Sequence, residues 1–377
     1  MPTFYELLPT SEEGKAEEQL TRKIRRDKIK KILFHVLAVF AVMLVALQGL
    51  KSFIKTSERF LTYGGKGCHG MQRNLSSLPS HYALPSGDKI PSVALGVWQA
   101  APGEVGPAVK TALSAGYRHI DGAWAYRNEK EVGKAIRDSG VPRDQLFITS
   151  KLWNNFHAPE DIEPALDESL TALDTEYLDL YLIHWPIAFK NDGANVLDKE
   201  LTANPYPTWQ KLEELVDKGK VRNIGISNFN IARIQNLTAN PLKYQPAVNQ
   251  VELNYWNPQP ELLKAKHNLL LEAYSPLGSN KQVKETLSLP VVQEICHELG
   301  ITPAQVIISW HVQRGVVVLP KSVTPSRVEE NLKIFELPEE LFNKLEEAAT
   351  AHAPKRVVNP SQNWKLGFDI FDEDWPL

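Results

Sequence analysis

Four polar residues, each at or just beyond the end of an apolar, β-branched run, have side chains suited to acid–base chemistry. Asp121 lies within GYRHIDG and Tyr126 follows it shortly after, Lys151 lies within TSKLW, and His184 lies within LIHWP. Such a set lacks a nucleophile with its own base. It can, however, protonate a carbonyl oxygen while another group delivers hydride.

The four side chains have complementary acid–base properties. A tyrosine phenol has a reference pKa of about 10 and is a proton donor at neutral pH. A nearby ammonium makes a phenol more acidic because it stabilises the phenolate, and Lys151 could supply that charge to Tyr126. A buried Lys151 needs a counter-charge, which Asp121 is placed to give. His184 could then hydrogen-bond the substrate oxygen and hold it near the phenol.

Each of these residues also has a structural explanation when it is taken alone. Asp121 could be a helix cap, Lys151 a surface charge, Tyr126 a packed aromatic residue and His184 a satisfied core histidine. The catalytic explanation is favoured because the four residues arrive together at three successive strand ends.

Short β-branched runs alternate with helical patterns from about residue 80 onward, which predicts an α/β fold over residues 79–377. The alternation by itself is also compatible with a doubly wound open sheet. A (β/α)8 TIM barrel is favoured because polar residues end several different strands. The eight predicted strands are 92–98, 117–123, 146–153, 178–185, 221–229, 247–253, 269–275 and 316–320.

The first part of the chain differs from the rest. Residues 1–31 form a polar and basic tail, and residues 32–50 are almost wholly apolar. As a helix, this run would be roughly 28 Å long, close to the hydrocarbon core of about 30 Å. We therefore predict a single transmembrane helix at 32–50, which makes the membrane a partner, and a linker at 51–78.

The predicted localisation is single-pass membrane, with the side left open. Lys and Arg are denser before the run than after it, which places the N-terminus in the cytosol. Hydride transfer of the kind that the four polar residues could assist needs a reduced cofactor, which favours a cytosolic catalytic part instead. A foreign N-terminal extension on an ordinary soluble enzyme would make the protein cytoplasmic.

Composition and motifs argue against several other classes. The net charge of −3 gives no reason to expect nucleic acid as a partner. Two cysteines, Cys68 and Cys296, cannot form a zinc-binding cluster, so no metal is expected. The G-x-G-x-x-G pattern at 65–70 has no strand before it and no helix after it, so we interpret it as linker. We expect a monomeric barrel.

Several segments resemble signature segments of the aldo-keto reductases, in that family's order and spacing. They are GYRHIDGAWAYRNEKEVGKAI, TSKLW, LIHWP, GISNF, AVNQVE, AYSPLGS and LPKSVTPSR. Within the family, the chain is similar to fungal glycerol-dehydrogenase-like and aldehyde-reductase-like members. The resemblance implies NADPH-dependent reduction of aldehydes or ketones. It also implies that Tyr126 is the general acid, Lys151 and Asp121 its activating pair, and His184 the group that orients the carbonyl.

The resemblance further implies a binding site for NADPH or NADP+ without a Rossmann fold. Small residues after the seventh strand would let backbone N–H groups approach the pyrophosphate. Lys321 and Arg327, near the start of a helix, would suit a 2′-phosphate and so favour NADP(H). The expected cofactor-binding residues are Ser227, Asn228, Gln250, Tyr274, Ser275, Leu277, Ser279, Lys321, Ser322, Arg327, Glu330 and Asn331.

Aromatic residues are expected to line the substrate site. Trp98, Trp153 and Trp185 are the principal candidates, together with His184 and a C-terminal tail that carries Trp364. Aromatic walls favour apolar or aromatic aldehydes, yet small polyols and sugars also stack on such rings. The sequence does not choose among these small-molecule carbonyl substrates.

Two other functions remain as alternatives. Lys151 at a strand end could be the nucleophile of a Schiff-base aldolase, which would not depend on a nicotinamide cofactor. A membrane-associated, cofactor-binding regulatory subunit would instead bind NADPH tightly with negligible turnover. The reductase is the favoured function because the Asp, Tyr, Lys and His set comes together with a candidate phosphate loop.

Overall fold

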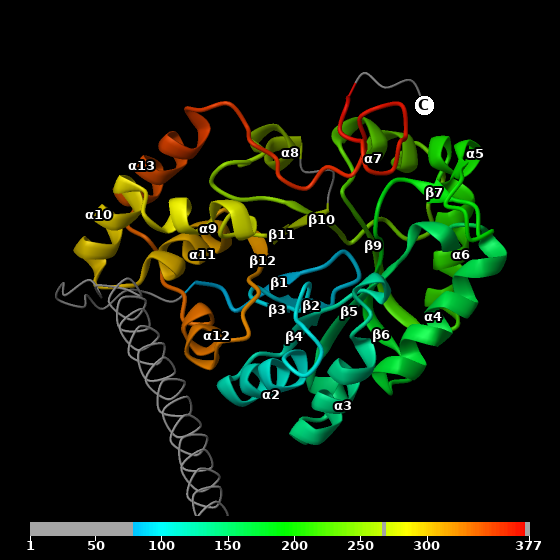
Figure 1. The fold of residues 1–377 in the computed structure, drawn as a ribbon, viewed down its shortest axis with the longest axis horizontal. Coiled ribbons are helices and arrows are strands. Elements are labelled where there is room, and N and C mark those ends of the chain that lie inside the picture. Colours follow the sequence, from blue (N-terminus) through cyan, green and yellow to red (C-terminus); the bar gives the residue numbers. More distant parts are fainter. Residues whose placement is uncertain (1–77, 266–268, 374–377) are drawn as a thin grey trace, which may run out of the picture. The chain divides into compact units, whose positions relative to one another are not determined.

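The computed structural model describes residues 78–265 and 269–373, which contain a (β/α)8 barrel (Figure 1). All eight strand predictions are confirmed. The strands are β3 (Leu95–Gly96), β4 (His119–Asp121), β5 (Phe147–Leu152), β6 (Leu178–Ile183), β9 (Val221–Ser227), β10 (Val248–Glu252), β11 (Leu270–Tyr274) and β12 (Val316–Leu319).

The sheet closes on itself, which excludes the doubly wound alternative. Its strands pair in parallel from β3 to β12, in chain order. The segment leading into β3 then meets β12, where Val93 forms a parallel bridge with Val318. The Ala94 amide donates to the Val318 carbonyl at 2.9 Å, and the Val318 amide donates to the Ser92 carbonyl at 2.9 Å.

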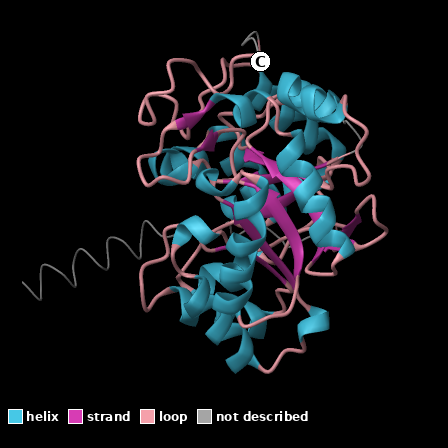
Figure 2. Ribbon diagram, turned by 90° about the vertical axis from the view of Figure 1, so that its right-hand side faces the viewer, coloured by secondary structure: helices cyan, strands magenta, loops and turns pink. Residues whose placement is uncertain are grey.

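Helices surround the strands, as Figures 1 and 2 show. Those that follow the first seven barrel strands in turn, or lie between them, are α2 (Val105–Ala115), α3 (Glu129–Ser139), α4 (Pro159–Leu173), α5 (Lys199–Ala203), α6 (Tyr206–Asp217), α7 (Ile231–Thr238), α8 (Pro260–Ala265) and α9 (Ser279–Leu287). The remaining helices are α10 (Pro290–Leu299), α11 (Pro303–Gln313), α12 (Pro325–Asn331) and α13 (Glu339–Thr350).

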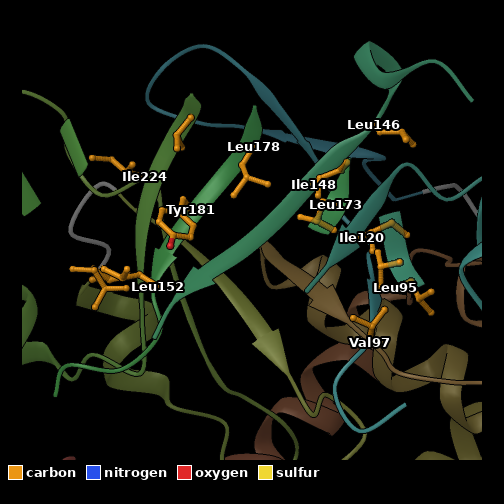
Figure 3. Close-up of a cluster of buried hydrophobic side chains, with 14 of the residues drawn as sticks. Leu95, Val97, Ile120, Leu146, Ile148, Leu152, Leu173, Leu178, Tyr181 and Ile224 are labelled. Carbon is orange, nitrogen blue, oxygen red and sulfur yellow. The ribbon is translucent and has the colours of Figure 1, made fainter. Parts of the chain in front are cut away.

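Successive side chains of each strand point to opposite faces of the sheet, so they contribute to two apolar cores. The outer core lies between strands and helices, and the inner core lies inside the barrel. In β5, Ile148 and Leu152 join the apolar layer between strands and helices, which Figure 3 shows in part. Phe147, one residue out of phase with Ile148, joins the inner core instead. Lys151 has the same parity as Phe147, so the strand period directs its side chain to the barrel interior.

An antiparallel hairpin contributes to the inner core. It consists of β1 (His81–Ala83) and β2 (Lys89–Pro91). Ile90 is fully buried and belongs to the same cluster as Leu180, Leu182 and Val317 of the barrel strands. Because apolar side chains fill this part of the interior, the polar side chains at the carboxyl ends of the barrel strands lie above a packed core and not in an open pore.

One glycine fixes how closely two helices approach. A Cβ at Gly133 of α3 would lie 2.5 Å from the carbonyl oxygen of Leu173 in α4. The obstacle is backbone, so the helices must move apart to admit a methyl group. We expect Gly133→Ala to lower the free energy of unfolding by about 1–3 kcal/mol, although Ala favours helix by about 1 kcal/mol.

Urea denaturation followed by circular dichroism measures this change. Lys130→Ala, on the exposed face of the same helix, is the matched control and should unfold as the parent does. A Gly133→Ala protein as stable as the parent would contradict the close contact between α3 and α4.

The predicted membrane localisation needs correction. In residues 78–265 and 269–373, the structure contains no helix with both the length and the apolar character that a bilayer crossing requires. The longest described helix, α4, has 15 residues. On this finding the single-pass membrane localisation is wrong. The segment at 32–50 itself lies outside the described residues, and the boundaries at 31, 50 and 78 stay predictions.

Candidate active site

The carboxyl ends of β4, β5 and β6 bring predicted site residues to one rim of the barrel. Asp121 ends β4, Lys151 is the penultimate residue of β5, and His184 directly follows β6. The Lys151 Nζ lies 2.8 Å from Asp121 Oδ1 and 2.7 Å from the Gly122 carbonyl oxygen. Both charged side chains are buried. The expected ion pair is therefore present, while the catalytic roles stay predictions.

A tight turn after β4 places Tyr126 beside this pair. The residue ends a 3-10 turn, Trp124–Tyr126, and the next residue, Arg127, has a left-handed backbone with φ of 58°. The Arg127 guanidinium stacks 3.4 Å from the centre of the Trp124 ring. Asn128 connects the end of the turn to the segment after β3 by donating to the Val97 carbonyl. The Tyr126 hydroxyl consequently lies 3.4 Å from Lys151 Nζ.

Burial and charge act in opposite directions on this pair. Burial, the largest single effect, would lower the pKa of Lys151, but the attraction of Asp121, together with smaller effects of Tyr126 and Glu272, raises it overall. Burial raises the pKa of the Tyr126 phenol, and Lys151 offsets this only in part. The lowered phenol pKa expected from the sequence is therefore not found. At neutral pH the site holds a protonated phenol beside an ammonium.

His184 is a neutral imidazole at physiological pH. Burial and the charge of Lys151 lower its pKa well below the ordinary value. Its ring lies edge-on to the Tyr126 ring, with centres 5.8 Å apart, and 5.2 Å from the Trp153 ring. A neutral imidazole carries one N–H, so His184 can donate a hydrogen bond without competing with Tyr126 as the acid.

Four of the expected cofactor-binding residues form one hydrogen-bonded group. The Ser227 hydroxyl donates to the Gln250 carbonyl at 2.8 Å, and the Asn228 amide donates to Ser227 Oγ at 3.0 Å and to the His184 carbonyl at 2.9 Å. The Tyr274 hydroxyl donates to Asn228 Oδ1 at 2.8 Å. Asn228 has a φ of 65°, a conformation that costs energy outside glycine. Backbone strain of this kind is common at functional sites.

The predicted phosphate loop joins β11 to α9. Gly278 has a φ of 93°, and a Cβ there would lie 2.8 Å from Thr286 Oγ1, so the turn requires glycine. Ser275 and Ser279 are also left-handed, with φ of 50° and 47°. The partly buried Leu277 side chain packs against the apolar cores.

A pocket of about 300 Å³ lies beside this loop. It is lined by Trp98, Gln99, Ser279, Asn280, Lys281, Val357, Val358, Asn359, Pro360 and Asn363. The first N–H groups of α9 have no side-chain cap, and within the described part of the chain the buried Ser279 hydroxyl has no partner. With the Lys281 ammonium nearby, these donors fit a phosphate group.

The expected cofactor-binding residues between positions 321 and 331 do not line this pocket. Lys321 and Arg327 are exposed, and neither forms an ion pair within residues 78–265 and 269–373. Ser322 Oγ accepts from the Thr324 amide. Glu330 accepts from the Thr302 hydroxyl at the start of α11, so part of its hydrogen-bonding capacity has a structural use. Asn331 is buried at the end of α12.

Aromatic side chains gather beside His184, as expected. Trp185 is buried and Trp153 partly buried, and both meet Trp364 of the C-terminal tail edge-on, with ring centres 5.3 and 6.0 Å apart. Phe189 and Ile370 belong to the same apolar cluster. Trp98 is 42% exposed and lines the pocket near the loop. The tail thus completes a largely apolar cluster beside His184.

Charged side chains attach the tail, residues 356–373, to the barrel. Glu252, fully buried at the end of β10, accepts from the Val357 amide at 2.9 Å and from the Val358 amide at 2.7 Å. At the far end, the Glu373 carboxylate accepts from two amides at the start of α7. Between them, the Arg233 guanidinium donates to the Ile370 carbonyl.

Removal of the Glu252 charge should loosen this tail. In Glu252→Gln, an amide NH2 would face at least one backbone N–H, with a loss of about 1.5–3 kcal/mol for hydrogen bonds to a charged group. We expect faster hydrogen exchange at 357–371 and a higher KM for carbonyl substrates. Glu213→Gln is the matched control, because Glu213 accepts from the Lys243 and Tyr244 amides in the same manner. Equal exchange in both variants and the parent would contradict the anchoring role.

Sequence reasoning missed several charged and polar residues of the site. Glu252 and Glu272 are fully buried carboxyls on β10 and β11, and Gln99 and Lys281 line the pocket. For the two glutamates a signal was present, because each is the one charged residue of a strand, VNQVE or LLEAY. Gln99 lies in a loop and Lys281 in the first turn of α9, and the sequence around each of them has no pattern that gives the direction of its side chain.

The comparisons with known proteins agree with this geometry. Residues 92–350 match the model of the Aldo/keto reductase family. A Saccharomyces cerevisiae protein named glycerol 2-dehydrogenase (NADP(+)) is 44% identical over 77% of this chain and 96% of its own length. Human aldo-keto reductase family 1 member A1 is 44% identical over 68% of this chain and 86% of its own length.

A solved structure gives the same result. The aldose reductase of Schistosoma japonicum superposes with a TM-score of 0.68 at 39% identity, over 76% of this chain and 96% of that one. The residues that match the family model include Asp121, Tyr126, Lys151 and His184. The chain therefore belongs to the aldo/keto reductase family.

Proposed function

We propose that this protein reduces aldehydes and ketones to alcohols with NADPH, and that Tyr126 is the acid that protonates the carbonyl oxygen. The observation that carries the proposal is the position of the Tyr126 hydroxyl, 3.4 Å from a buried ammonium that Asp121 holds in place. Membership of the family and the NADP(+) named for its relatives support the cofactor.

The four residues have separate tasks in this proposal. Bound NADPH supplies the hydride that reduces the carbonyl carbon. The Tyr126 O–H donates its proton to the carbonyl oxygen, and the Lys151 ammonium stabilises the phenolate that remains. Asp121 keeps Lys151 charged and oriented. The neutral His184 imidazole donates a hydrogen bond to the same oxygen and holds it near the phenol.

The cofactor would be held by residues at the carboxyl ends of β9 to β12 and in the loops that follow these strands. Ser227, Asn228 and Gln250 would hold the nicotinamide carboxamide, with Tyr274 against the ring. The donors of Ser279 and of the first turn of α9 would meet the pyrophosphate. The exposed cations Lys321 and Arg327, with Ser322, Glu330 and Asn331, would take the adenosine end. Neither cation has an ion-pair partner among the described residues, and the two charges favour a 2′-phosphate there.

The aldolase alternative is not supported by the geometry of Lys151. A Schiff-base nucleophile must be a neutral amine that is open to the substrate. Lys151 is 0% exposed, is paired with Asp121 and has a raised pKa. Among the described residues no feature favours a purely regulatory subunit over an enzyme.

The test is oxidation of NADPH by the purified full-length protein with a panel of carbonyl compounds. The panel holds aromatic aldehydes, glyceraldehyde and dihydroxyacetone, because a relative is named for oxidation of glycerol at its second carbon. We expect turnover with NADPH and weaker turnover with NADH. Tight NADPH binding without turnover on every compound would overturn the proposal.

A further inference from the structure

A third carboxyl group lies in the barrel interior beside the Asp121 and Lys151 pair. Glu272 of β11 is 0% exposed and is aligned with Gln250 of β10 on one side and with Val317 of β12 on the other. Neither neighbour is titratable. The charged groups that face Glu272 across the barrel are Asp121 and Lys151.

One amide group connects Glu272 to the catalytic pair. The Gln250 Nε2 donates to Asp121 Oδ1 at 2.8 Å and to Glu272 Oε2 at 3.0 Å. The same Asp121 Oδ1 accepts from Lys151 Nζ at 2.8 Å. An unbroken series of contacts therefore runs from Glu272 through Gln250, Asp121 and Lys151 to the Tyr126 hydroxyl.

The charges in this series balance without Glu272. Lys151 and Asp121 form a neutral pair, so a second carboxylate would leave an uncompensated charge in the barrel interior. Glu272 Oε1 is buried and has no hydrogen-bond partner in the described part of the chain, so no donor stabilises a negative charge on that oxygen. Burial, reinforced by Asp121, raises the pKa of Glu272 to about 8.

We infer that Glu272 is a positioning residue of the active site, whose carboxyl fixes Asp121 and Lys151 through the Gln250 amide and whose charge acts on the Lys151 and Tyr126 pair. This inference rests on the proposed function for its effect on turnover. Its effect on proton binding does not, because that effect is present in the protein without cofactor.

The direction of the effect follows from the sign of the charge. Above its own pKa, Glu272 is negative and makes the loss of a proton from the Lys151 and Tyr126 pair less favourable. Glu272→Gln keeps the hydrogen bond with Gln250 but removes this charge. The pair should therefore lose its first proton at a pH lower by about 0.5–1 unit, a shift that belongs to the pair as a whole.

Two measurements on the full-length, cofactor-free protein test this directly. Infrared difference spectra with ¹³C-labelled glutamate should show a protonated glutamic acid that ionises near pH 8 in the parent and is absent from Glu272→Gln. Ultraviolet titration of the phenolate, with Tyr126→Phe as the blank in each background, should show the downward shift. A parent without such a carboxyl overturns the inference, even where Glu272→Gln folds poorly.

The pH profile of carbonyl reduction provides the third measurement. The fall of kcat at alkaline pH should move to lower pH by the same amount in Glu272→Gln, and Glu272→Asp, which keeps a carboxyl, should restore the parent profile. Asp179→Asn is the matched control, because Asp179 is a buried carboxyl near the opposite end of the barrel, paired with Arg143. It should lower stability and leave the profile unchanged.

The outcomes separate this inference from the proposed function. An identical alkaline limb in Glu272→Gln and parent, or the same shift in Asp179→Asn, would show that Glu272 has only a structural role. A parent that does not reduce carbonyl compounds would overturn the proposed function, and the infrared and phenolate titrations would still decide the role of Glu272.

Discussion

Tyr126→Phe should lower kcat for carbonyl reduction by about 10²–10⁴-fold, the contribution of a well-placed general acid. The substitution removes one oxygen atom and keeps the ring, which lies edge-on to His184. The hydroxyl donates to no structural partner among the described residues and meets only Lys151. We therefore expect NADPH binding and the free energy of unfolding to stay close to those of the parent.

Steady-state kinetics with saturating NADPH, together with fluorescence titration of NADPH binding, measures both parts of this prediction. Tyr206→Phe, in the first residue of α6, is the matched control, since the Tyr206 hydroxyl donates one exposed hydrogen bond to the Pro241 carbonyl. A Tyr126→Phe enzyme within a few-fold of parent kcat would show that the proton comes from another group.

Lys151→Met should reduce both activity and stability. Methionine fills similar space, but it leaves the Asp121 carboxylate buried without its ammonium. The loss of one partner from a buried pair costs about 3–5 kcal/mol of unfolding free energy. The phenolate of Tyr126 loses its stabilising charge as well, so kcat should fall at least as far as in Tyr126→Phe. Urea denaturation and steady-state kinetics give the two values.

Two further variants distinguish the loss of the ion pair between Asp121 and Lys151 from the replacement of a lysine side chain by methionine. Asp121→Asn combined with Lys151→Met removes both charges and should be more stable than Lys151→Met alone, which a double-mutant cycle detects. Lys110→Met breaks the exposed pair with Asp138 and should change stability little. Equal stability of Lys151→Met and the parent would contradict the role of this ion pair in the barrel.

The sequence was sufficient to predict the barrel because segments with the period of a strand alternate regularly with segments that have the period of a helix. Each apolar run that was predicted as a strand contains a strand of the barrel. Within β5, the alternation of side chains directs Lys151 to the barrel interior, while Ile148 and Leu152 face the helices. Contact between Asp121 and Lys151 then follows, because carboxyl ends of parallel strands meet at one rim.

Other features depended on contacts that no local pattern encodes. The phenol pKa of Tyr126 is a balance of burial against charge, and only the structure shows that burial prevails. The attachment of the tail to Glu252 joins residues 105 positions apart. Glu272 stood out as a charge in an apolar strand, yet its connection through Gln250 to Asp121 requires three strands in register.

A single-turnover experiment with NADPH deuterated at the transferable position of C4 tests the central claim most directly. The enzyme and labelled NADPH are mixed with an aldehyde, and deuterium in the alcohol and the rate of NADPH loss are measured for parent and Tyr126→Phe. We expect deuterium on the former carbonyl carbon in the parent, and transfer at least about 100-fold slower in the variant at equal NADPH occupancy. Deuterium absent from the product, or equal transfer rates in the two proteins, would contradict the account.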